Sequence, residues 1–354
     1  MNDINDSSVE LIVTSPPYPM IEMWDSSFVD ADERVGVALR DHNGAEAFEL
    51  MHRYLDQVWR ECARVVRPGG FVCINIGDAT RKLGENFRLY TNHSRITVAL
   101  EQLGLQSLPA ILWRKQTNAP NKFMGSGMLP SGAYVTLEHE YILIFRKGDK
   151  RVMKRDEAAT RRRSAFFWEE RNVWFSDIWD FKGVKQPLTG VGARERSAAY
   201  PFELAYRLIN MYSMQGDTVL DPFLGTGTTS AAALVLARNS VGYEIDSDLR
   251  NAIDETIAQA AARADAMVQE RFRRHMEFIQ SREEAGNPPA HTNVVYGFPV
   301  VTRQEVELEL MTVDQIDSTG ASGFRAKHSM IRPAQPERSG EVRTQEQLAL
   351  KFSE

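Results

Sequence analysis

Short apolar runs alternate with amphipathic stretches along most of the chain, which predicts strands and helices in turn. The run VELIVT at residues 9–14 is rich in β-branched side chains and stops at two prolines, as a buried strand does. Apolar residues spaced three and four apart then predict a helix from about Ala45 to Arg64. After a turn at Pro68-Gly69-Gly70, the run FVCINIG at residues 71–77 predicts a second buried strand.

The alternation covers most of the remaining chain. Helices are predicted at 97–103, at 200–211, from the loop with Gly225 and Gly227 to about 237, and at 248–284. Strands are predicted at 108–115, 134–146, 218–221 and 240–245. Residues 147–195 interrupt the pattern, and a short segment at 293–310 predicts a strand and a helix. The tail from about Ser318 is rich in Gly, Ser, Pro and charge, which predicts disorder. Strands and helices in this order predict an α/β fold with a doubly wound sheet.

The bulk composition narrows the class of protein. At 354 residues, with 43% hydrophobic and 25% charged residues, the chain suits one large α/β domain with an insert, or two domains. No apolar run reaches the roughly 18 residues of a membrane span. The polar start is also unlike a signal peptide, so we expect a cytoplasmic protein without a membrane segment. Cys62 and Cys73 fall within apolar patterns and are expected to be reduced core residues. With a net charge of −6, any contact with nucleic acid needs a local basic face.

The segment TVLDPFLGTGTT at residues 218–229 joins a predicted strand to a predicted helix through a loop with two glycines. Glycines at such a place let the backbone approach a ligand closely, and helix amides after the loop offer donors to an anionic group. Glu244 follows at the tip of the next predicted strand, where a carboxylate can accept hydrogen bonds from ribose hydroxyls. The pattern therefore predicts a cofactor that carries a ribose.

Two other interpretations of this loop fit less well. A glycine turn of any α/β protein is the plainest one, and a dinucleotide oxidoreductase would carry GxGxxG, whereas Ser230 stands in the place of the third glycine. The residues ahead of the glycines resemble the first motif of amino methyltransferases, in which an acid and an aromatic residue border the methionine end of S-adenosylmethionine. The resemblance implies S-adenosylmethionine as the cofactor, held by Asp221, Pro222, Phe223, Gly225, Gly227, Thr228 and Glu244.

The strand end Thr14-Ser15-Pro16-Pro17-Tyr18 is the second informative feature. A strand followed by Asp, Asn or Ser, then Pro-Pro and Tyr or Phe, resembles the catalytic motif of amino methyltransferases that act on adenine or cytosine. An exocyclic amine is a poor nucleophile because its lone pair is delocalised into the ring, and acceptors aimed at its N–H groups favour attack on a sulfonium methyl. The Ser15 hydroxyl and the Pro16 carbonyl can serve as those acceptors, with the backbone fixed by both prolines. Tyr18 can stack on a base flipped from the duplex.

The residue before the prolines bears on the target base. Serine at this place resembles the cytosine-N4 branch of the family, whereas adenine-N6 enzymes mostly carry Asp or Asn. Cytosine N4 is therefore the predicted target and adenine N6 the alternative. Methylation of cytosine carbon 5 is disfavoured, because it needs a cysteine nucleophile, usually in a Pro-Cys pair, and neither Cys62 nor Cys73 follows a proline. A proline-terminated core strand with a packed tyrosine is the structural alternative, and the glycine loop argues against it.

The catalytic motif precedes the cofactor motif by about two hundred residues. This order resembles the circularly permuted β class, whose fold is a doubly wound, Rossmann-like methyltransferase domain with an inserted target recognition region. The resemblance covers roughly residues 9–250. It implies a catalytic half at 1–146, a target recognition insert at 147–193, a cofactor-binding half at 194–284, a small appendage at 285–317 and a disordered tail at 318–354. The helix expected ahead of the cofactor strand opens with Arg194 to Ser197, where the family often has His-Pro.

The stretch from Arg146 to Arg163 has nine Lys or Arg against three acidic residues, and an aromatic-rich stretch follows it. In this chain order we expect the basic side chains to neutralise DNA phosphates, while the aromatic part or residues 116–128 read bases. A solvated basic loop is the alternative. The predicted phosphate contacts are Lys150, Arg151, Lys154, Arg155, Arg161, Arg162 and Arg163.

The predicted activity is site-specific methylation of double-stranded DNA at the N4 amine of cytosine, without a metal. In a restriction–modification system the partner would be a restriction endonuclease acting on the same site, and the oligomeric state stays open. A non-catalytic DNA-binding remnant is the rival hypothesis. It is motivated by the ten residues that precede LIVT, where relatives often have an extra strand, and by a helix after Glu244 in place of a third cofactor strand. A start within a longer protein would explain the short N-terminus.

Overall fold

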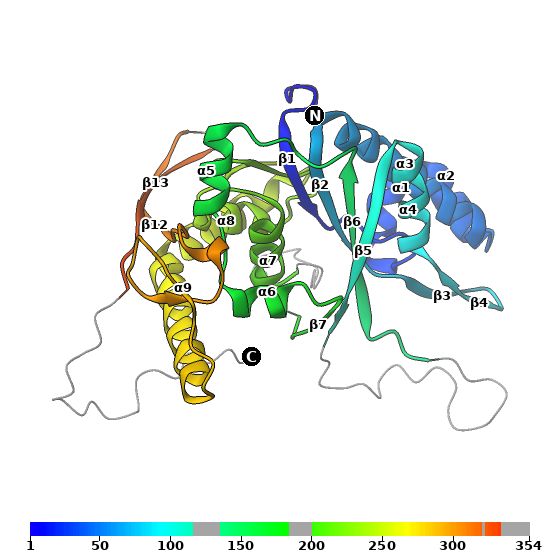
Figure 1. The fold of residues 1–354 in the computed structure, drawn as a ribbon. Helices are drawn as coiled ribbons and strands as arrows, with labels where there is room; N and C mark the ends of the chain where they lie inside the picture. Colours follow the sequence, from blue (N-terminus) through cyan, green and yellow to red (C-terminus); the bar gives the residue numbers. More distant parts are fainter. Residues whose placement is uncertain (116–134, 184–199, 321–322, 334–354) are drawn as a thin grey trace, which may run out of the picture.

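A seven-stranded sheet forms the centre of the computed structural model, which describes residues 1–115, 135–183, 200–320 and 323–333 (Figure 1). Its strands are β1 (Val9–Thr14), β2 (Val66–Ile76), β5 (Leu105–Arg114), β6 (His139–Lys147), β7 (Ile178–Asp180), β8 (Thr218–Asp221) and β9 (Asn239–Gly242). They lie in the order β7-β5-β6-β2-β1-β8-β9. Only β6 runs antiparallel to its neighbours in this sheet. Strands from both ends of the chain therefore build one sheet.

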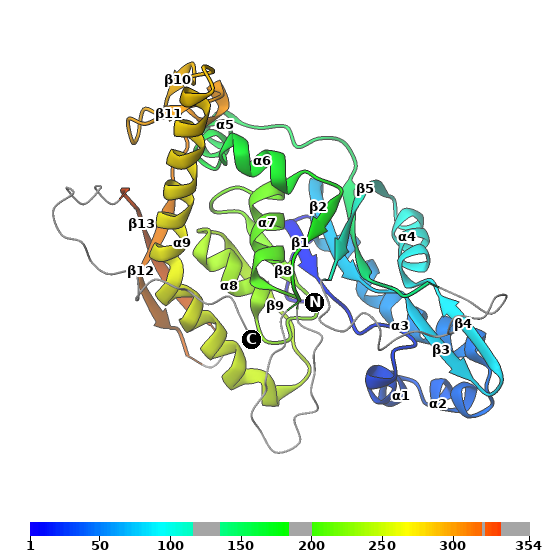
Figure 2. The same cartoon turned by 90° about the horizontal axis from the view of Figure 1, so that it is seen from below.

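Helices cover both faces of the sheet (Figures 1 and 2). One face carries α3 (Gly44–Val65) and α4 (Asn92–Gln102), and the other carries α7 (Phe202–Tyr212), α8 (Thr228–Val235) and part of α9 (Arg250–Glu284). Side chains of a strand alternate between the faces, so Ile12 of β1 packs in the first core while Leu11 and Val13 pack in the second. The predicted doubly wound α/β fold is confirmed.

The parallel strands give the sheet two chemically different edges. The ends of β1, β2, β5, β7, β8 and β9 lie together at one of them, here termed the carboxyl edge, where antiparallel β6 begins at His139. The opposite edge, termed the amino edge, lies beside α5 (Arg155–Arg163) in the upper part of Figure 1. In open α/β sheets ligands bind outside the carboxyl ends of the strands. The carboxyl edge is therefore the place to look for a site.

Several elements of the first half have no counterpart in the hydrophobic pattern. They are the short helix η1 (Glu22–Trp24), α1 (Asp25–Ala31), α2 (Glu33–Arg40), and the hairpin of β3 (Ala79–Leu83) with β4 (Asn86–Tyr90). An ion pair of 2.6 Å between Arg81 and Asp25 joins the hairpin to α1. The hairpin follows directly on β2 and projects beyond the carboxyl edge (Figure 1).

Residues 147–193 were expected to form a target recognition insert, but their described part packs onto the main domain. It contains α5, α6 (Trp168–Trp174) and β7, and β7 pairs with β5 of the central sheet. Phe167, Trp174 and Trp179 are buried in the cores, which explains the richness in aromatic residues without contact to bases. Trp168 and Phe175 of the same stretch are exposed, so packing accounts for part of the aromatic stretch.

The C-terminal part departs from the predicted disordered tail. After the pair β10 (His291–Thr292) and β11 (Pro299–Val300) and the short helix η4 (Arg303–Glu305), β12 (Met311–Ser318) pairs with β13 (Phe324–Met330). Val313, Ile316 and Phe324 of this hairpin pack against the core, while its other side carries the polar residues that made the sequence look disordered. Residues 334–354 lie outside the described residues. In the described part of the chain, no helix is both long and apolar enough to cross a membrane.

Candidate active site

The segment after β1 turns at the carboxyl edge. The hydroxyl of buried Thr14 donates to Asp221 Oδ1 at 2.6 Å and so ties the end of β1 to the end of β8. Two prolines then stop the strand, and the chain turns where the Ile21 amide donates to the Tyr18 carbonyl at 3.2 Å. Ser15 is left half-buried at the strand end.

The hydroxyls of Ser15 and Tyr18 belong to a cluster of five side chains, termed the Tyr18 network, which also contains Asn75, Glu140 and Lys115. The Tyr18 hydroxyl donates to Glu140 Oε2 at 2.9 Å, and accepts from Asn75 Nδ2 at 2.8 Å and from Ser15 Oγ at 3.2 Å. Asn75 Nδ2 also lies 2.7 Å from Glu140 Oε2, and Lys115 forms an ion pair with Glu140 Oε1. Burial, reinforced by the Glu140 carboxylate, raises the pKa of Tyr18 well above its ordinary value, so the hydroxyl keeps its proton.

Asn92, the first residue of α4, supports two turns of the carboxyl edge. Its Nδ2 donates to the carbonyl of Pro19 at 3.1 Å and to that of Gly77 at 2.9 Å. Its Oδ1 lies 3.0 Å from Nε2 of His52, which is fully buried on α3. Burial lowers the pKa of His52 to about 4, so the imidazole is neutral near pH 7 and its Nε2–H donates to Asn92. Uncharged hydrogen bonds thus hold the loop that carries Tyr18.

The loop between β8 and α8 follows the predicted glycine geometry. Gly225 and Gly227 have φ angles of +55° and +86°, and a Cβ at Gly227 would lie 3.2 Å from Ile253 Cγ2. The Gly225 amide donates to Glu244 Oε2 at 2.8 Å, and the Asp246 amide donates to Glu244 Oε1 at 2.8 Å. The predicted pairing of the glycine loop with Glu244 at one edge is therefore present, with Glu244 just beyond β9 instead of within it.

Asp221 has a different environment from the one expected. Its side chain is 1% exposed, and Oδ1 accepts from the Thr14 hydroxyl and from the Phe223 amide at 3.1 Å. Oδ2 accepts from the Thr229 hydroxyl at 2.7 Å and from the Tyr200 hydroxyl at 3.3 Å. Four donors occupy the acceptor capacity of a carboxylate. The geometry therefore argues against the predicted direct contact with a cofactor and makes Asp221 the link between the two motifs.

The remaining residues of the predicted cofactor set lie around the same loop. Pro222 is buried, and the half-buried ring of Phe223 lies 5.9 Å from the ring of Trp59 on α3. Thr228 is buried at the first residue of α8. Only Phe223, Gly225 and Glu244 of that set are partly exposed, so any ligand would contact these first.

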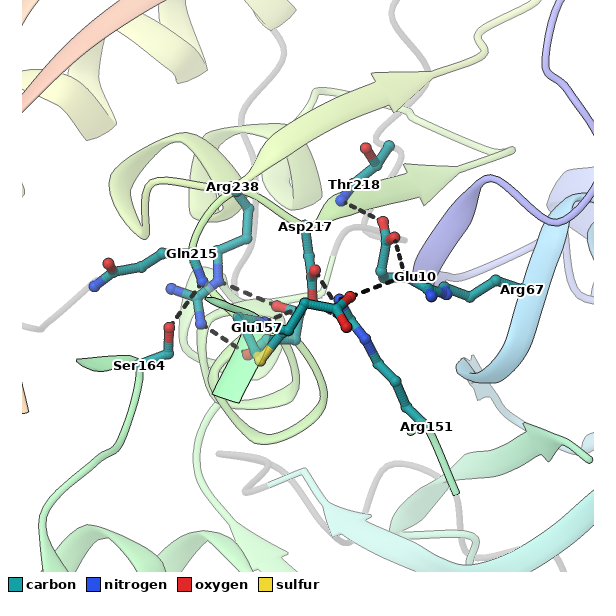
Figure 3. Close-up of polar contacts among 12 residues, drawn as sticks. Glu10, Arg67, Arg151, Glu157, Ser164, Gln215, Asp217, Thr218 and Arg238 are labelled. Carbon is teal, nitrogen blue, oxygen red and sulfur yellow. Dashed lines mark hydrogen bonds and ion pairs between the residues drawn. The ribbon is translucent and has the colours of Figure 1, made fainter. Parts of the chain in front are cut away.

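The basic segment lies at the amino edge, away from Ser15. Arg151 pairs with Asp217 at 2.9 Å and with Glu157 at 2.7 Å, and only 14% of its side chain is exposed. Figure 3 shows this group beside the 3.0 Å ion pair of Glu10 with Arg67. An arginine enclosed in this way has its charge compensated within the protein, which argues against the predicted phosphate contact.

The other basic residues of the segment lie at the same edge. Arg162 pairs with Glu307 at 2.8 Å and Arg163 with Glu309 at 3.7 Å. Lys150, Lys154, Arg155 and Arg161 are exposed there. Their DNA contact stays a prediction that this location disfavours. Residues 116–128, the other expected base readers, and the departure at Arg194 to Ser197 lie outside the described residues.

Four residues at the carboxyl edge were not foreseen from the sequence. Asn75, Glu140 and Lys115 stand at strand ends of β2, β6 and β5, and Ile245, next to Glu244, is 94% exposed. A carboxylate at the start of an apolar strand marks a candidate functional residue in the sequence. Only the antiparallel direction of β6, however, brings Glu140 beside Tyr18. An exposed isoleucine beside the carboxylate that was predicted to bind ribose offers an apolar surface for a nucleoside base.

With this geometry in place, comparison with known proteins defines the class of the chain. Residues 9–255 match the model of the DNA methylase family, so the chain belongs to that family. It is 52% identical over 313 residues to the Type II methyltransferase M.MthZI of Methanothermobacter thermautotrophicus, which covers 88% of this chain and 87% of the relative. It is 51% identical over 268 residues to the Type II methyltransferase M.MjaI of Methanocaldococcus jannaschii, covering 73% of this chain and 88% of the relative.

Solved structures agree on the fold. A protein of Thermus thermophilus described as a DNA modification methylase, solved in complex with S-adenosyl-L-methionine, is 32% identical, with a TM-score of 0.56. The match covers 73% of this chain and 89% of the Thermus chain. The cytosine-N4-specific PvuII DNA methyltransferase shares the fold at 14% identity and a TM-score of 0.50, over 74% of this chain and 88% of that enzyme. The predicted methyltransferase family is thus confirmed, while the permuted β class stays a prediction.

Proposed function

We propose that the chain is a Type II modification methyltransferase that transfers a methyl group from S-adenosylmethionine to the N4 amine of cytosine in a specific DNA sequence. The observation that carries the proposal is the hydrogen bond between Thr14 and Asp221. It joins the end of the Ser-Pro-Pro-Tyr strand to the start of the glycine loop, so the two predicted motifs meet at adjacent strands of the carboxyl edge. The DNA methylase family and the two Type II relatives support the same activity.

The residues beyond β8 fit S-adenosylmethionine. A Cβ at Gly225 would meet no heavy atom closer than 4.0 Å, so the loop leaves open space beside this glycine, and the amino end of α8 follows directly. Each Glu244 oxygen accepts one amide hydrogen bond, which leaves each a further lone pair for ribose hydroxyls. The Phe223 amide and the Thr14 hydroxyl donate to the same oxygen of Asp221, and Ile245 offers an apolar surface for the adenine. The cofactor of the Thermus relative supports this assignment.

The residues beyond β1 fit a base amine. When bound, the cofactor supplies a methyl group on a positively charged sulfur, which is open to attack by a nitrogen lone pair. The Ser15 hydroxyl and the Pro16 carbonyl accept hydrogen bonds from the two N–H groups and so favour a more tetrahedral nitrogen. Tyr18 then stacks on the base, which has to leave the duplex to reach this edge. Holding the amine in place makes proximity a large part of the rate.

The choice of cytosine N4 over adenine N6 rests on Ser15, because serine at this place resembles the cytosine-N4 branch. Carbon-5 methylation has no suitable nucleophile in the described residues. Cys62 and Cys73 are free but fully buried, and burial raises the pKa of both thiols. We also propose double-stranded DNA as the substrate and a restriction endonuclease for the same sequence as the partner in the cell.

The product of the reaction tests this proposal. DNA modified by the purified enzyme with methyl-labelled S-adenosylmethionine would be digested to nucleosides and analysed by mass spectrometry. We expect N4-methylcytosine as the labelled product, and N6-methyladenine alone would overturn the choice of base. If no label enters DNA and calorimetry detects no S-adenosylmethionine binding at millimolar concentration, the chain is a non-catalytic remnant and the proposal fails.

A further inference from the structure

The direction of each hydrogen bond in the Tyr18 network determines what Ser15 can do. The Ser15 hydroxyl has one proton, and both acceptors within reach lie on the protein side, namely the Asn75 carbonyl at 3.1 Å and the Tyr18 oxygen at 3.2 Å. Among the described residues, no group donates to Ser15 Oγ. Since the proton is directed inward, the lone pairs of Ser15 remain available to a donor from outside.

The Tyr18 oxygen has three hydrogen-bond partners within reach. Its single proton goes to Glu140 Oε2 at 2.9 Å, it accepts from Asn75 at 2.8 Å, and it shares the one Ser15 proton with the Asn75 carbonyl. Because burial keeps Tyr18 protonated, its hydroxyl proton has to point toward a hydrogen-bond acceptor. With a carboxylate in reach it points to Glu140, whereas without one it could turn to Ser15 Oγ and occupy the lone pair that the substrate needs.

We propose that Glu140 is a positioning residue that orients the Tyr18 proton and thereby keeps Ser15 a hydrogen-bond acceptor for the target amine. The inference deepens the proposed function and rests on it. An ionised carboxylate only accepts hydrogen bonds. Glu140 therefore determines which atom donates and which accepts in the hydrogen bonds that connect it through Tyr18 to Ser15. No other described side chain accepts a hydrogen bond from the Tyr18 hydroxyl.

Lys115 completes this arrangement from the other side. It forms an ion pair with Glu140 Oε1, while its ammonium lies 4.8 Å above the ring of Trp113. The ammonium occupies Oε1, so Oε2 is the oxygen that receives Tyr18 and Asn75. The side chains come from the ends of β5, β6, β2 and the loop after β1. The availability of Ser15 Oγ as a hydrogen-bond acceptor therefore depends on four segments of the chain.

Suppression of one substitution by another tests the proposal. In Glu140→Gln the amide oxygen is drawn to Lys115, so its NH2 group faces Tyr18 and the phenol proton turns to Ser15; we expect kcat to fall at least about tenfold. Tyr18→Phe keeps the ring and removes the phenol proton, so its kcat gives the level that an enzyme without a misdirected proton can reach. The double variant lacks the misdirected proton, so its kcat should rise clearly above that of Glu140→Gln.

Cofactor affinity and a matched control complete the design. Calorimetry should give a Kd for S-adenosylmethionine within about twofold of the parental value in all three variants, which shows that they fold. Glu138→Gln, the same exchange at an exposed residue two positions earlier, should leave kcat unchanged. A double variant no faster than Glu140→Gln, or full activity of Glu140→Gln, would overturn the role of Glu140. Both outcomes compare the kcat of a variant with that of a parental enzyme that methylates DNA. If the parental enzyme itself did not methylate DNA, the result would count against the proposed function instead.

Discussion

At the amino edge Arg151 is enclosed between Asp217 and Glu157, whereas at the carboxyl edge no described residue donates to Ser15 Oγ. The first group satisfies its charges within the protein and connects the start of β8 to the segment after β6 (Figure 3). The second leaves acceptors open at the place where strands end. Charge density alone pointed to the first edge as the DNA contact, but a group that is already paired has little left to offer a ligand.

The two edges are also held by different kinds of interaction. Ion pairs hold the amino edge, while the loop with Tyr18 rests on the neutral pair of His52 and Asn92. Substitution of Ser15 should therefore lower activity without loss of stability, and substitution of Arg151 should lower stability without loss of activity.

Ser15→Ala is expected to have the largest effect. Loss of a hydrogen-bonding group that acts in the transition state typically lowers kcat by about 10²–10³. Since Ser15 follows β1 and Glu244 follows β9, two strands away in the sheet, the Kd for S-adenosylmethionine should stay within about twofold. Single-turnover transfer of labelled methyl to DNA measures the first quantity and calorimetry the second. Parental kcat in this variant would remove Ser15 from the mechanism.

Arg151→Met is expected to change stability without changing chemistry. Removing one partner of a largely buried ion pair leaves Asp217 without its counter-charge and should cost about 3 kcal/mol of unfolding free energy. Urea unfolding measures this loss, with Arg162→Met as the exposed control at less than about 1 kcal/mol. At a temperature where both variants are folded, kcat and the salt dependence of DNA binding should match the parental enzyme. A weaker salt dependence in Arg151→Met would restore this edge as a DNA contact.

Acid should affect the two edges at different pH. The pKa of His52 is about 4 in the fold against an ordinary value of 6.5, so between these values the unfolded chain binds a proton that the folded chain does not. Stability is therefore full above pH 6.5 and falls by roughly 3 kcal/mol toward pH 4. The Arg151 guanidinium lowers the pKa of Glu157 to about 2, so that carboxylate loses its contribution only below about pH 4.5. Unfolding at pH 7, 5.5 and 4 should show a smaller loss in His52→Gln, and an equal loss would contradict this origin.

Exposed cations of α5 should have the smallest effect. Exchange of Lys154, Arg155 and Arg161 for glutamine is expected to leave the KM for DNA and its salt dependence unchanged. Proteins that neutralise phosphates lose about one unit of the log–log salt slope per contact, so a slope reduced by two or three would show that α5 binds DNA.

The elements with a strong local hydrophobic pattern could be predicted from the sequence. The strand 9–14 and the strand 218–221 have the predicted bounds, because a buried strand ended by Pro or by a glycine loop leaves a sharp pattern. The hairpin of β3 and β4 was missed because its exposed residues lack apolar alternation. Strand β13 fell within the tail that was predicted to be disordered, since only one side of its hairpin with β12 packs against the core.

The site divides in the same way. Ser15, Tyr18, Gly225, Gly227 and Glu244 stand in local motifs and could be named from their neighbours in the chain. Asn75, Glu140 and Lys115 lie 57 or more residues from Tyr18, and only the order and direction of β2, β6 and β5 bring them together. The ion pair of Arg151 could not be foreseen because its partner Asp217 lies 66 residues away. Pairing across such distances is a property of the fold and not of the local sequence.

Hydrogen exchange in the presence of DNA tests the difference between the edges most directly. Amide exchange of the enzyme would be compared with and without its methylated target duplex, at saturating S-adenosylmethionine. We predict slower exchange in the segments 15–21 and 75–90 at the carboxyl edge, and unchanged exchange in 150–163. Protection of 150–163 with no change at 15–21 would place DNA on the amino edge and contradict the account.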